Sequence, residues 1–442
     1  MQQPETQQNS GSDDRPRILF AISDTGGGHR SAAVAIKAAL DLIAGDTVEC
    51  HIVDMLTSTG LPLARSAPEL YDYLRNRWLS VFDFAFQITD GPRRADAITW
   101  MLYFSAHRNI LRVLEQIRPT MVVSVHPLTN RFIANTRLVY RLSFHFITVV
   151  TDLVSLHASW SDPQAELCIV PTEEALAKVH LPPEKVIRTG FPIHPKFLSY
   201  NHTRQEARAV LNLAADRFTV LVTSGGVDSS QARELVQRLA EVYPEQQFLV
   251  VTGKNATLKA ELEKLELGKH VRIYGFVNNM EELMGASDLV ITKAGPGTLM
   301  EALVLGRPVI VTEAIGMQER GNIDFVLNRE LGAFCPTVDR IVPAVADLME
   351  PSTYQATVAR LADAVPRDGS LEIANIILQR LQLAPPTRRK RRLRLPTIAD
   401  LKRLGSRLRP RRIRQPRPPR QPQPPRTERF MAIRRLGRWR RS

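Results

Sequence analysis

The sequence predicts an α/β fold with two parallel-sheet domains, and three observations support this. The 442 residues are enough for two domains of ordinary size and a tail. Short β-branched strand patterns alternate with amphipathic helix patterns, which is typical of βαβ units. The alternation pauses at residues 191–205, which contain two prolines, and then starts again. We therefore expect two Rossmann-like halves facing across a cleft, with ligands at the carboxyl ends of the strands.

The pattern divides the chain into five parts. Residues 1–15 are polar and lack the apolar segment of a signal peptide, so we expect a disordered leader. Residues 16–190 form the first domain and residues 206–383 the second, joined by a linker at 191–205. Residues 384–442 are rich in arginine and proline and cannot bury a core, so this tail is expected to be disordered on its own.

The net charge of +14 is unevenly distributed along the chain. From Pro385 to Ser442 there are 22 lysines and arginines and two acidic residues, a net charge of +20. The rest of the chain has 37 basic and 43 acidic residues, a net charge of −6. An argument from charge to a partner therefore concerns the tail alone. An anionic lipid surface and a nucleic acid are the two polyanions that compete for it.

The cysteines and the hydropathy pattern exclude several classes of protein. Cys50, Cys168 and Cys335 have no paired spacing, which argues against a disulfide framework or a zinc site and fits a reducing compartment. No apolar run approaches the length of a membrane-spanning helix. We expect a cytoplasmic protein that can still lie on a membrane.

A glycine-rich turn near the amino end is the first candidate site. Gly26, Gly27 and Gly28 follow a strand pattern and precede a helix pattern, so a ligand can approach the backbone there. His29 stands at the amino end of the helix, where the dipole favours a neutral imidazole that can accept a proton. The spacing is not that of the dinucleotide-binding fingerprint. The alternative interpretation is a sharp turn with a histidine cap.

A second glycine loop lies in the other half of the chain. A buried strand ends at Lys293, residues 294–297 form the loop, and Thr298 is expected to open a helix. A diphosphate could rest on the helix amino end, with Thr298 donating a hydrogen bond. Glu301, about one turn further on, is suited to accept hydrogen bonds from a ribose diol. The alternative is a helix capped by Thr298, with Glu301 as the capping-box acid.

Two further stretches supply polar or flexible groups after strands. Gln318, Glu319 and Asn322 lie in a polar segment just after a strand, where sugar hydroxyls could be held. Gly225 and Gly226 form a third glycine turn of lower specificity. On their own these stretches are consistent with ordinary loops.

Six motifs together resemble one enzyme family. They are SDTGGGHRSAA, SVHPL, TDLVSLHASW, GFPIHPKF, KAGPGTLMEAL and GMQERGN, spread from about Pro16 to Gln382. This set resembles the monogalactosyldiacylglycerol synthases and the related diacylglycerol glucosyltransferases. The peptidoglycan N-acetylglucosaminyltransferase shares the glycine–histidine turn and the second glycine loop, but TDLVSLHASW is closer to the diacylglycerol enzymes. The resemblance implies a GT-B glycosyltransferase.

The resemblance also implies residue roles. His29 would be the catalytic base, with Asp152 as a second catalytic residue, and Asp24 or Asp152 would orient or assist the base. The acceptor lipid would contact His126, His157 and Trp160, and the tryptophan would also serve anionic-lipid contacts. The donor would bind Gly27, Gly28, His194, Gly225, Gly226, Phe276, Lys293, Gly295, Pro296, Gly297, Thr298, Glu301, Gln318, Glu319 and Asn322.

Two departures from the plant-type pattern bear on the donor. His194 stands where those enzymes usually carry an arginine that is associated with the nucleotide, and a histidine carries no assured charge. The GGVDSS turn is less glycine-rich than its plant counterpart.

The implied reaction is an inverting transfer of galactose from UDP-galactose to the sn-3 hydroxyl of 1,2-diacylglycerol. The body has no Asp-x-Asp pair, so no metal or other cofactor is expected. Residues 60–112 mix aromatics and arginines, and with the basic tail they predict peripheral binding to the inner face of the cell membrane, not to nucleic acid.

Other functions remain open at this stage. UDP-glucose could replace UDP-galactose, because the two sugars differ in the orientation of one hydroxyl. A UDP-N-acetylglucosamine-using transferase or a 2-epimerase would share the fold. A nucleotide-sensing or RNA-binding protein would rest on the tail alone.

Overall fold

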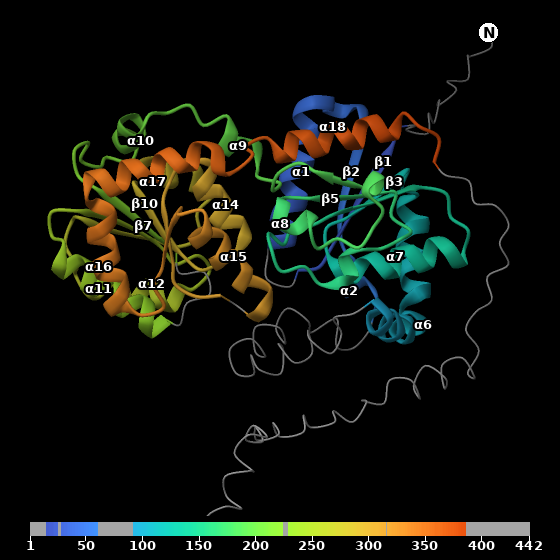
Figure 1. The fold of residues 1–442 in the computed structure, drawn as a ribbon, viewed down its shortest axis with the longest axis horizontal. Helices are drawn as coiled ribbons and strands as arrows, with labels where there is room; N and C mark the ends of the chain where they lie inside the picture. The colour runs from blue at the N-terminus through green and yellow to red at the C-terminus, as the bar shows by residue number, and fades with distance from the viewer. Residues whose placement is uncertain (1–14, 25–27, 61–91, 224–228, 315, 386–442) are drawn as a thin grey trace, which may run out of the picture. The chain divides into compact units, whose positions relative to one another are not determined.

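The computed structural model describes residues 15–24, 28–60, 92–223, 229–314 and 316–385 (Figure 1). All structural statements concern these residues, and for residues 92–102, 229–230 and 317 they concern the backbone. The expected leader up to residue 14, the tail from residue 386, and Gly27, Gly225 and Gly226 lie outside them.

The described chain contains two parallel β-sheets. The first has the strand order β2-β1-β3-β4-β5-β6 and the second has the order β12-β11-β10-β7-β8-β9. The first sheet consists of β1 (Arg17–Ile22), β2 (Glu49–Asp54), β3 (Met121–Ser124), β4 (His145–Val149), β5 (Leu167–Val170) and β6 (Val186–Arg188). The second consists of β7 (Thr219–Thr223), β8 (Gln247–Val251), β9 (Val271–Tyr274), β10 (Leu289–Thr292), β11 (Val309–Val311) and β12 (Gly332–Phe334).

Helices connect the strands, as the alternation predicts. Those up to β6 are α1 (Gly28–Ala44), η1 (Gly45–Thr47), α2 (Met55–Ser58), α6 (Pro92–Ile117), α7 (Pro127–Val139), η2 (Ala158–Trp160), α8 (Glu173–Leu176) and η3 (Pro183–Lys185). The later ones are α9 (Pro195–Leu198), α10 (Arg204–Val210), α11 (Ser229–Val242), α12 (Ala256–Glu263), α13 (Met280–Ala286), α14 (Pro296–Val304), α15 (Gly316–Asn328), α16 (Val338–Met349), α17 (Pro351–Ala364) and α18 (Gly369–Leu381).

The strand sequences form buried sheets because both of their faces are apolar. In β1, Ile18, Phe20 and Ile22 pack on one face of the first sheet, and Leu19 and Ala21 pack on the other. All five are fully buried. In β7 the alternation repeats, so each sheet is covered by helices on both faces. Strands buried on both faces have nearly continuous apolar sequences. This confirms the predicted fold class of two parallel-sheet α/β domains.

The strand orders fix where ligands can reach the sheets. In the first sheet the connection reverses direction between β1 and β3, and in the second between β7 and β10. Loops that leave the carboxyl ends of such neighbouring strands diverge and open a crevice. In the first sheet the described parts of these loops are residues 23–24 and 125–126, and in the second the loop after β10 is residues 293–295. Both glycine motifs therefore follow a strand at a reversal point.

The last helix leaves the second sheet and packs on the first. Ile373, Ala374 and Ile377 of α18 are fully buried in the apolar cluster that also contains Ile18 and Ile36. Figure 1 shows α18 beside α1, and the two helices are in contact. Residues 369–381 fall in the stretch assigned from sequence to the second domain, yet they complete the core of the first. Periodicity identifies the helix but does not say which sheet it covers.

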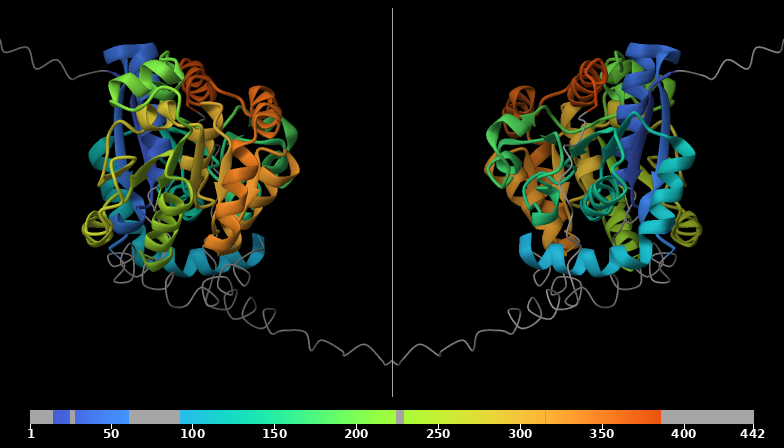
Figure 2. Two further views of the ribbon diagram at one scale, coloured as in Figure 1. Left: turned by 90° about the vertical axis from the view of Figure 1, so that its left-hand side faces the viewer. Right: turned by 90° about the vertical axis from the view of Figure 1, so that its right-hand side faces the viewer.

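Helix α6 packs beside elements at the reversal point of the first sheet, since it contacts η2 and α7, which His126 caps. It runs along the lower margin of both views in Figure 2 and contacts α2 and α7. It is 26 residues long, yet none of the described helices combines the length and hydropathy of a membrane span.

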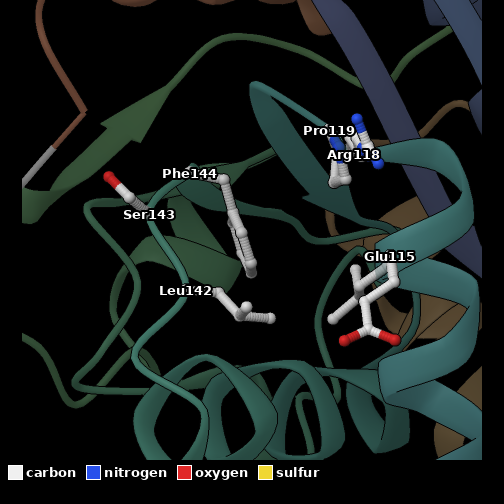
Figure 3. A pocket seen from close by; sticks show the side chains of 7 residues that line it. Glu115, Arg118, Pro119, Leu142, Ser143 and Phe144 are labelled. Carbon is white, nitrogen blue, oxygen red and sulfur yellow. The ribbon is translucent and has the colours of Figure 1, made fainter.

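A cavity of about 540 Å³ lies at the end of the first sheet where β3 and β4 begin (Figure 3). It is lined by residues of the segments that precede these two strands, including Leu114, Arg118, Leu142 and Phe144. It shares no residue with the candidate site.

Shortening Ile373 tests whether α18 is part of the first core. Ile373→Ala removes buried methyl groups, and such substitutions typically cost about 2–5 kcal/mol. We expect the urea midpoint, followed by circular dichroism, to fall clearly. Asn375→Ala on the exposed side of the same helix is the matched control and should leave the midpoint nearly unchanged. Equal midpoints for the two variants would contradict this packing.

Candidate active site

The His29 imidazole is held by two oxygen atoms from neighbouring strand ends. His29 is the second residue of α1, and its Nδ1 lies 2.8 Å from the Val125 carbonyl oxygen and 2.9 Å from Thr151 Oγ1. A carbonyl oxygen only accepts hydrogen bonds, so Nδ1 carries the proton and donates it. Nε2 is then the unprotonated nitrogen, and it has no hydrogen-bond partner among the described residues. This tautomer presents a free lone pair, as a general base requires.

Burial keeps this imidazole neutral. Desolvation lowers the pKa of His29 to about 4, and the hydrogen bond to the Val125 carbonyl opposes this only in part. The sequence predicts a neutral ring from the helix dipole, whereas here the largest cause is removal from water.

His126 stands at the edge of the same ring. Its ring centroid lies 4.4 Å from that of His29, in an edge-to-face arrangement. It is buried, and its Nδ1 accepts a hydrogen bond from the Leu128 backbone N–H as the cap of α7. Burial, and then the proximity of His29, lower the pKa of His126. The reversal of strand order between β1 and β3 brings the two histidines together.

Asp152 connects the two domains instead of contacting the base. Its Oδ2 accepts a hydrogen bond of 2.6 Å from Trp160 Nε1, and its Oδ1 accepts one of 2.7 Å from Gln318 Nε2 on α15. Burial raises the pKa of Asp152 to about 6, although both hydrogen bonds act to lower it. Gly321 allows α15 to come close, because a Cβ there would lie 2.6 Å from Ser155 Oγ. No hydrogen bond joins Asp152 to His29, so its catalytic role stays a prediction.

Three other residues assigned from the sequence have contacts that the sequence did not indicate. Trp160 is fully buried, with its ring centroid 6.4 Å from that of His29, so the ring packs near the base and is not exposed at a surface. The Asp24 carboxylate pairs with Arg30 at 2.6 and 2.7 Å, which lowers its pKa, and it does not orient His29. His157 is buried as the cap of η2, with Nδ1 accepting from the Ser159 N–H.

The second glycine loop starts its helix earlier than expected. α14 begins at Pro296, with Gly295 as N-cap, so Thr298 does not open it. Proline is favoured at the first helical position because its φ is already helical and its missing N–H has no helical partner there. A Cβ at Gly297, or at Gly28 in the other loop, would meet nothing within 4 Å. A side chain at either glycine would therefore meet no close neighbour.

Side chains from α15 organise the loop before α14. The segment from Gly316 to Asn328 is a helix, so Gln318, Glu319 and Asn322 occupy its first turns and not a polar loop. Glu319 pairs with Lys293 at 3.1 Å. Asn322 is 2% exposed, and its Nδ2 donates to the Ala294 carbonyl at 2.7 Å. Asn322 thus holds the loop in place and is not an exposed sugar contact.

Glu301 lies on α14, and α9, which His194 caps and which contains Lys196, contacts that helix. Burial raises the pKa of Glu301 to about 7, and Lys196 partly offsets this shift. His194 caps α9 by accepting from the Lys196 N–H, and burial lowers its pKa. Lys196 Nζ lies 2.6 Å from Glu281. α9 contacts both α1 and α14, so Lys196 brings a positive charge into the region where His194 has none.

Phe276 is the one exposed aromatic ring among the donor residues. It is 68% exposed and follows the carboxyl end of β9. An exposed ring at that edge is suited to stack on a nucleobase.

Three groups near the site were not identified from the sequence. The Val125 carbonyl is backbone and leaves no sequence signal. Thr151 lies in the TDLVSLHASW motif, directly before the aspartate that was singled out. Lys196 lies in the GFPIHPKF motif. Among the described residues, no three His, Cys, Asp or Glu side chains are grouped as metal ligands.

Comparison with known protein families and proteins identifies the family of this chain. The model of the monogalactosyldiacylglycerol (MGDG) synthase family matches residues 29–193. Monogalactosyldiacylglycerol synthase 1 of Arabidopsis thaliana is 30% identical over 365 residues, which cover 78% of this chain and 67% of the relative. The chain belongs to the monogalactosyldiacylglycerol synthase family. A second member, from Spinacia oleracea, is 30% identical over 77% of this chain and 68% of its own length.

The second domain and the solved structures agree with this family. The glycosyltransferase family 28 C-terminal domain matches residues 219–313. MurG of Acinetobacter baumannii superposes with a TM-score of 0.53 at 13% identity, covering 82% of this chain and 99% of its own. A UDP-GlcNAc 2-epimerase from Neisseria meningitidis superposes at 0.50 and 14%, covering 83% and 99%. These structures show the fold, which is GT-B, and family membership makes the chain a glycosyltransferase.

The lowered pKa of His29 has a direct test. With a pKa of about 4, the ring is about 99% neutral at pH 6, whereas a ring with the ordinary value of 6.5 is only about one quarter neutral. We expect histidine NMR signals of the folded protein to show no titration of His29 between pH 8 and pH 5.5. His29→Gln identifies the signal, and the urea-unfolded chain is the control. A midpoint near 6.5 in the folded protein would contradict the burial argument.

Proposed function

We propose that the protein transfers galactose from UDP-galactose to the sn-3 hydroxyl of 1,2-diacylglycerol, with inversion at the anomeric carbon. The observation that carries the proposal is the neutral His29 ring with Nδ1–H bound to the Val125 carbonyl and Nε2 free. A base of this kind suits an alcohol acceptor, which must lose a proton as it attacks. The names of the family members supply the lipid and sugar class.

The acceptor step falls to the first domain. The hydroxyl of the lipid donates to His29 Nε2 and attacks the anomeric carbon, giving up its proton to this nitrogen as the new C–O bond forms. The bond from the anomeric carbon to the diphosphate oxygen breaks in the same step, and UDP leaves with the electron pair. The imidazolium produced keeps its Nδ1–H bonds to Val125 and Thr151. The buried His126 and Trp160 rings pack beside His29 and limit its movement.

The donor falls to the second domain. The diphosphate is held over Gly295–Gly297, where the amino end of α14 offers free N–H groups and partial positive charge to the leaving UDP. Glu301 accepts from the ribose hydroxyls, Phe276 stacks on the base, and the pair of Gln318 and Glu319 faces the sugar. These roles come from the family resemblance, and the places of Glu301 on α14 and Phe276 after β9 are compatible with them.

The lipid acceptor implies a membrane surface. We propose that the basic tail, with its net charge of +20, holds the enzyme on the inner face of the cell membrane. Each basic residue near an anionic surface contributes about 1 kcal/mol. Residues 61–91, which also carry aromatics and arginines, lie outside the described residues.

His29→Ala tests the base. We expect transfer to fall at least about a hundred-fold, the range typical of a general base, while UDP binding by calorimetry stays near the wild-type value. The assay uses purified full-length protein, diacylglycerol vesicles and labelled UDP-sugar. His180→Ala, at an exposed site, is the matched control. Normal turnover by the His29 variant would overturn the assigned role.

The same assay separates the alternative reactions. Galactolipid from UDP-galactose supports the proposal, and glucolipid from UDP-glucose would replace its donor. Sugar conversion from a UDP-sugar without diacylglycerol would indicate an epimerase instead.

Removing residues 386–442 tests the membrane role of the tail. We expect the truncated protein to lose most of its binding to anionic vesicles in flotation assays, and to bind neutral vesicles as the full chain does. The loss should shrink at high salt, because charge drives the contact. Unchanged vesicle binding together with lost RNA binding would assign the tail to nucleic acid.

A further inference from the structure

We propose that Thr151 is a positioning residue for the reaction, and that its hydroxyl fixes the ring orientation and tautomer of His29. The inference rests on the proposed function for its link to turnover, but its structural part stands on contacts within the first domain.

Two acceptors from adjacent strands define the ring. Val125 follows β3 and Thr151 follows β4, and both present an oxygen to the same Nδ1, at 2.8 and 2.9 Å. One acceptor fixes a distance, while two acceptors on different strands also fix the direction of the N–H bond. Because β3 and β4 are paired in register, the two oxygens keep their separation without help from a mobile loop.

Among the described residues, the Thr151 hydroxyl has no hydrogen-bond partner other than His29. The Thr151 side chain is 2% exposed. Buried threonine hydroxyls commonly satisfy themselves on a nearby backbone carbonyl, as Thr136 does here with the Phe132 carbonyl. The Thr151 hydroxyl oxygen instead accepts a hydrogen bond from His29 Nδ1.

A hydroxyl, and not a carboxylate, accepts the hydrogen bond from His29 Nδ1 beside the Val125 carbonyl. Asp152 is bonded to Trp160 and Gln318, and Asp24 is bonded to Arg30, so neither supports His29. A neutral hydroxyl orients the ring without raising its basicity as an adjacent carboxylate would. The base thus stays unprotonated while it waits for the acceptor, and its Nε2 keeps one direction.

The activity arm compares three variants in the transfer assay. Thr151→Val keeps the shape and removes the acceptor, and kcat is expected to fall by about ten- to a hundred-fold, part of the contribution of a general base. KM for the UDP-sugar should change less than about two-fold, because donor contacts are untouched. Thr151→Ser should restore kcat to within a few-fold. Thr148→Val, the same change three residues earlier in β4, is the control and should retain activity.

The second arm needs no activity. In histidine-labelled wild-type protein, the His29 signal should show a single Nδ1–H tautomer. In Thr151→Val it should show a mixture of tautomers, or a broadened signal, and Thr151→Ser should return it to one tautomer. If the wild type transfers no sugar, the proposed function fails while the tautomer still decides the role of Thr151. Thermal melts check folding, and Thr151→Ala provides the same reading where the valine variant does not fold.

Two results would overturn the inference. One is an unchanged single tautomer in folded Thr151→Val or Thr151→Ala. The other is a kcat loss that Thr151→Ser does not rescue, which would mark the site as a packing position only.

Discussion

The bond from His29 Nδ1–H to the Val125 carbonyl is the contact on which the candidate site depends. It assigns the proton to one ring nitrogen and leaves the other free, and it requires α1 to start beside the end of β3. That neighbourhood exists because β1 lies between β2 and β3, so the loops after β1 and β3 diverge. A backbone carbonyl is insensitive to substitution, so the topology of the sheet supplies one of the two acceptors that hold Nδ1–H, and the Thr151 side chain supplies the other.

The second constraint is the burial of Asp152. A buried carboxyl is costly unless its oxygens are satisfied. Here one oxygen binds the first domain through Trp160 and the other binds the second through Gln318. The indole that receives this bond also packs near His29. Asp152 therefore links α15 of the second domain to the indole that packs near the base.

Sequence alone gives the fold class, because period-two burial on two faces and the repeated strand–helix pattern are local signals. It also finds both glycine loops and His29, since glycines between a strand and a helix have few other uses.

The errors come from contacts between residues that are distant in the chain. α18 completes the first core, and Trp160 turns inward to Asp152. Thr298 was taken as the helix opener because threonine is a good cap, but Pro296 starts the helix two residues earlier. The GMQERGN segment was expected to be a loop because it is polar, yet polar residues on the first turn of α15 face the neighbouring loop and domain.

The charges around α14 point to how a diphosphate can be accommodated. Lys293 is paired with Glu319 and Lys196 with Glu281, so both lysines have carboxylate partners before any donor arrives. A diphosphate that relied on either lysine would have to break an existing pair. The amino end of α14 has no such competitor, because its N-cap is a glycine without a side chain and the space over Gly297 is open. Partial charge fixed in the helix costs no rearrangement. On the proposed function, the arrangement therefore favours backbone N–H groups as the main contact of the leaving diphosphate, because both lysines already have carboxylate partners.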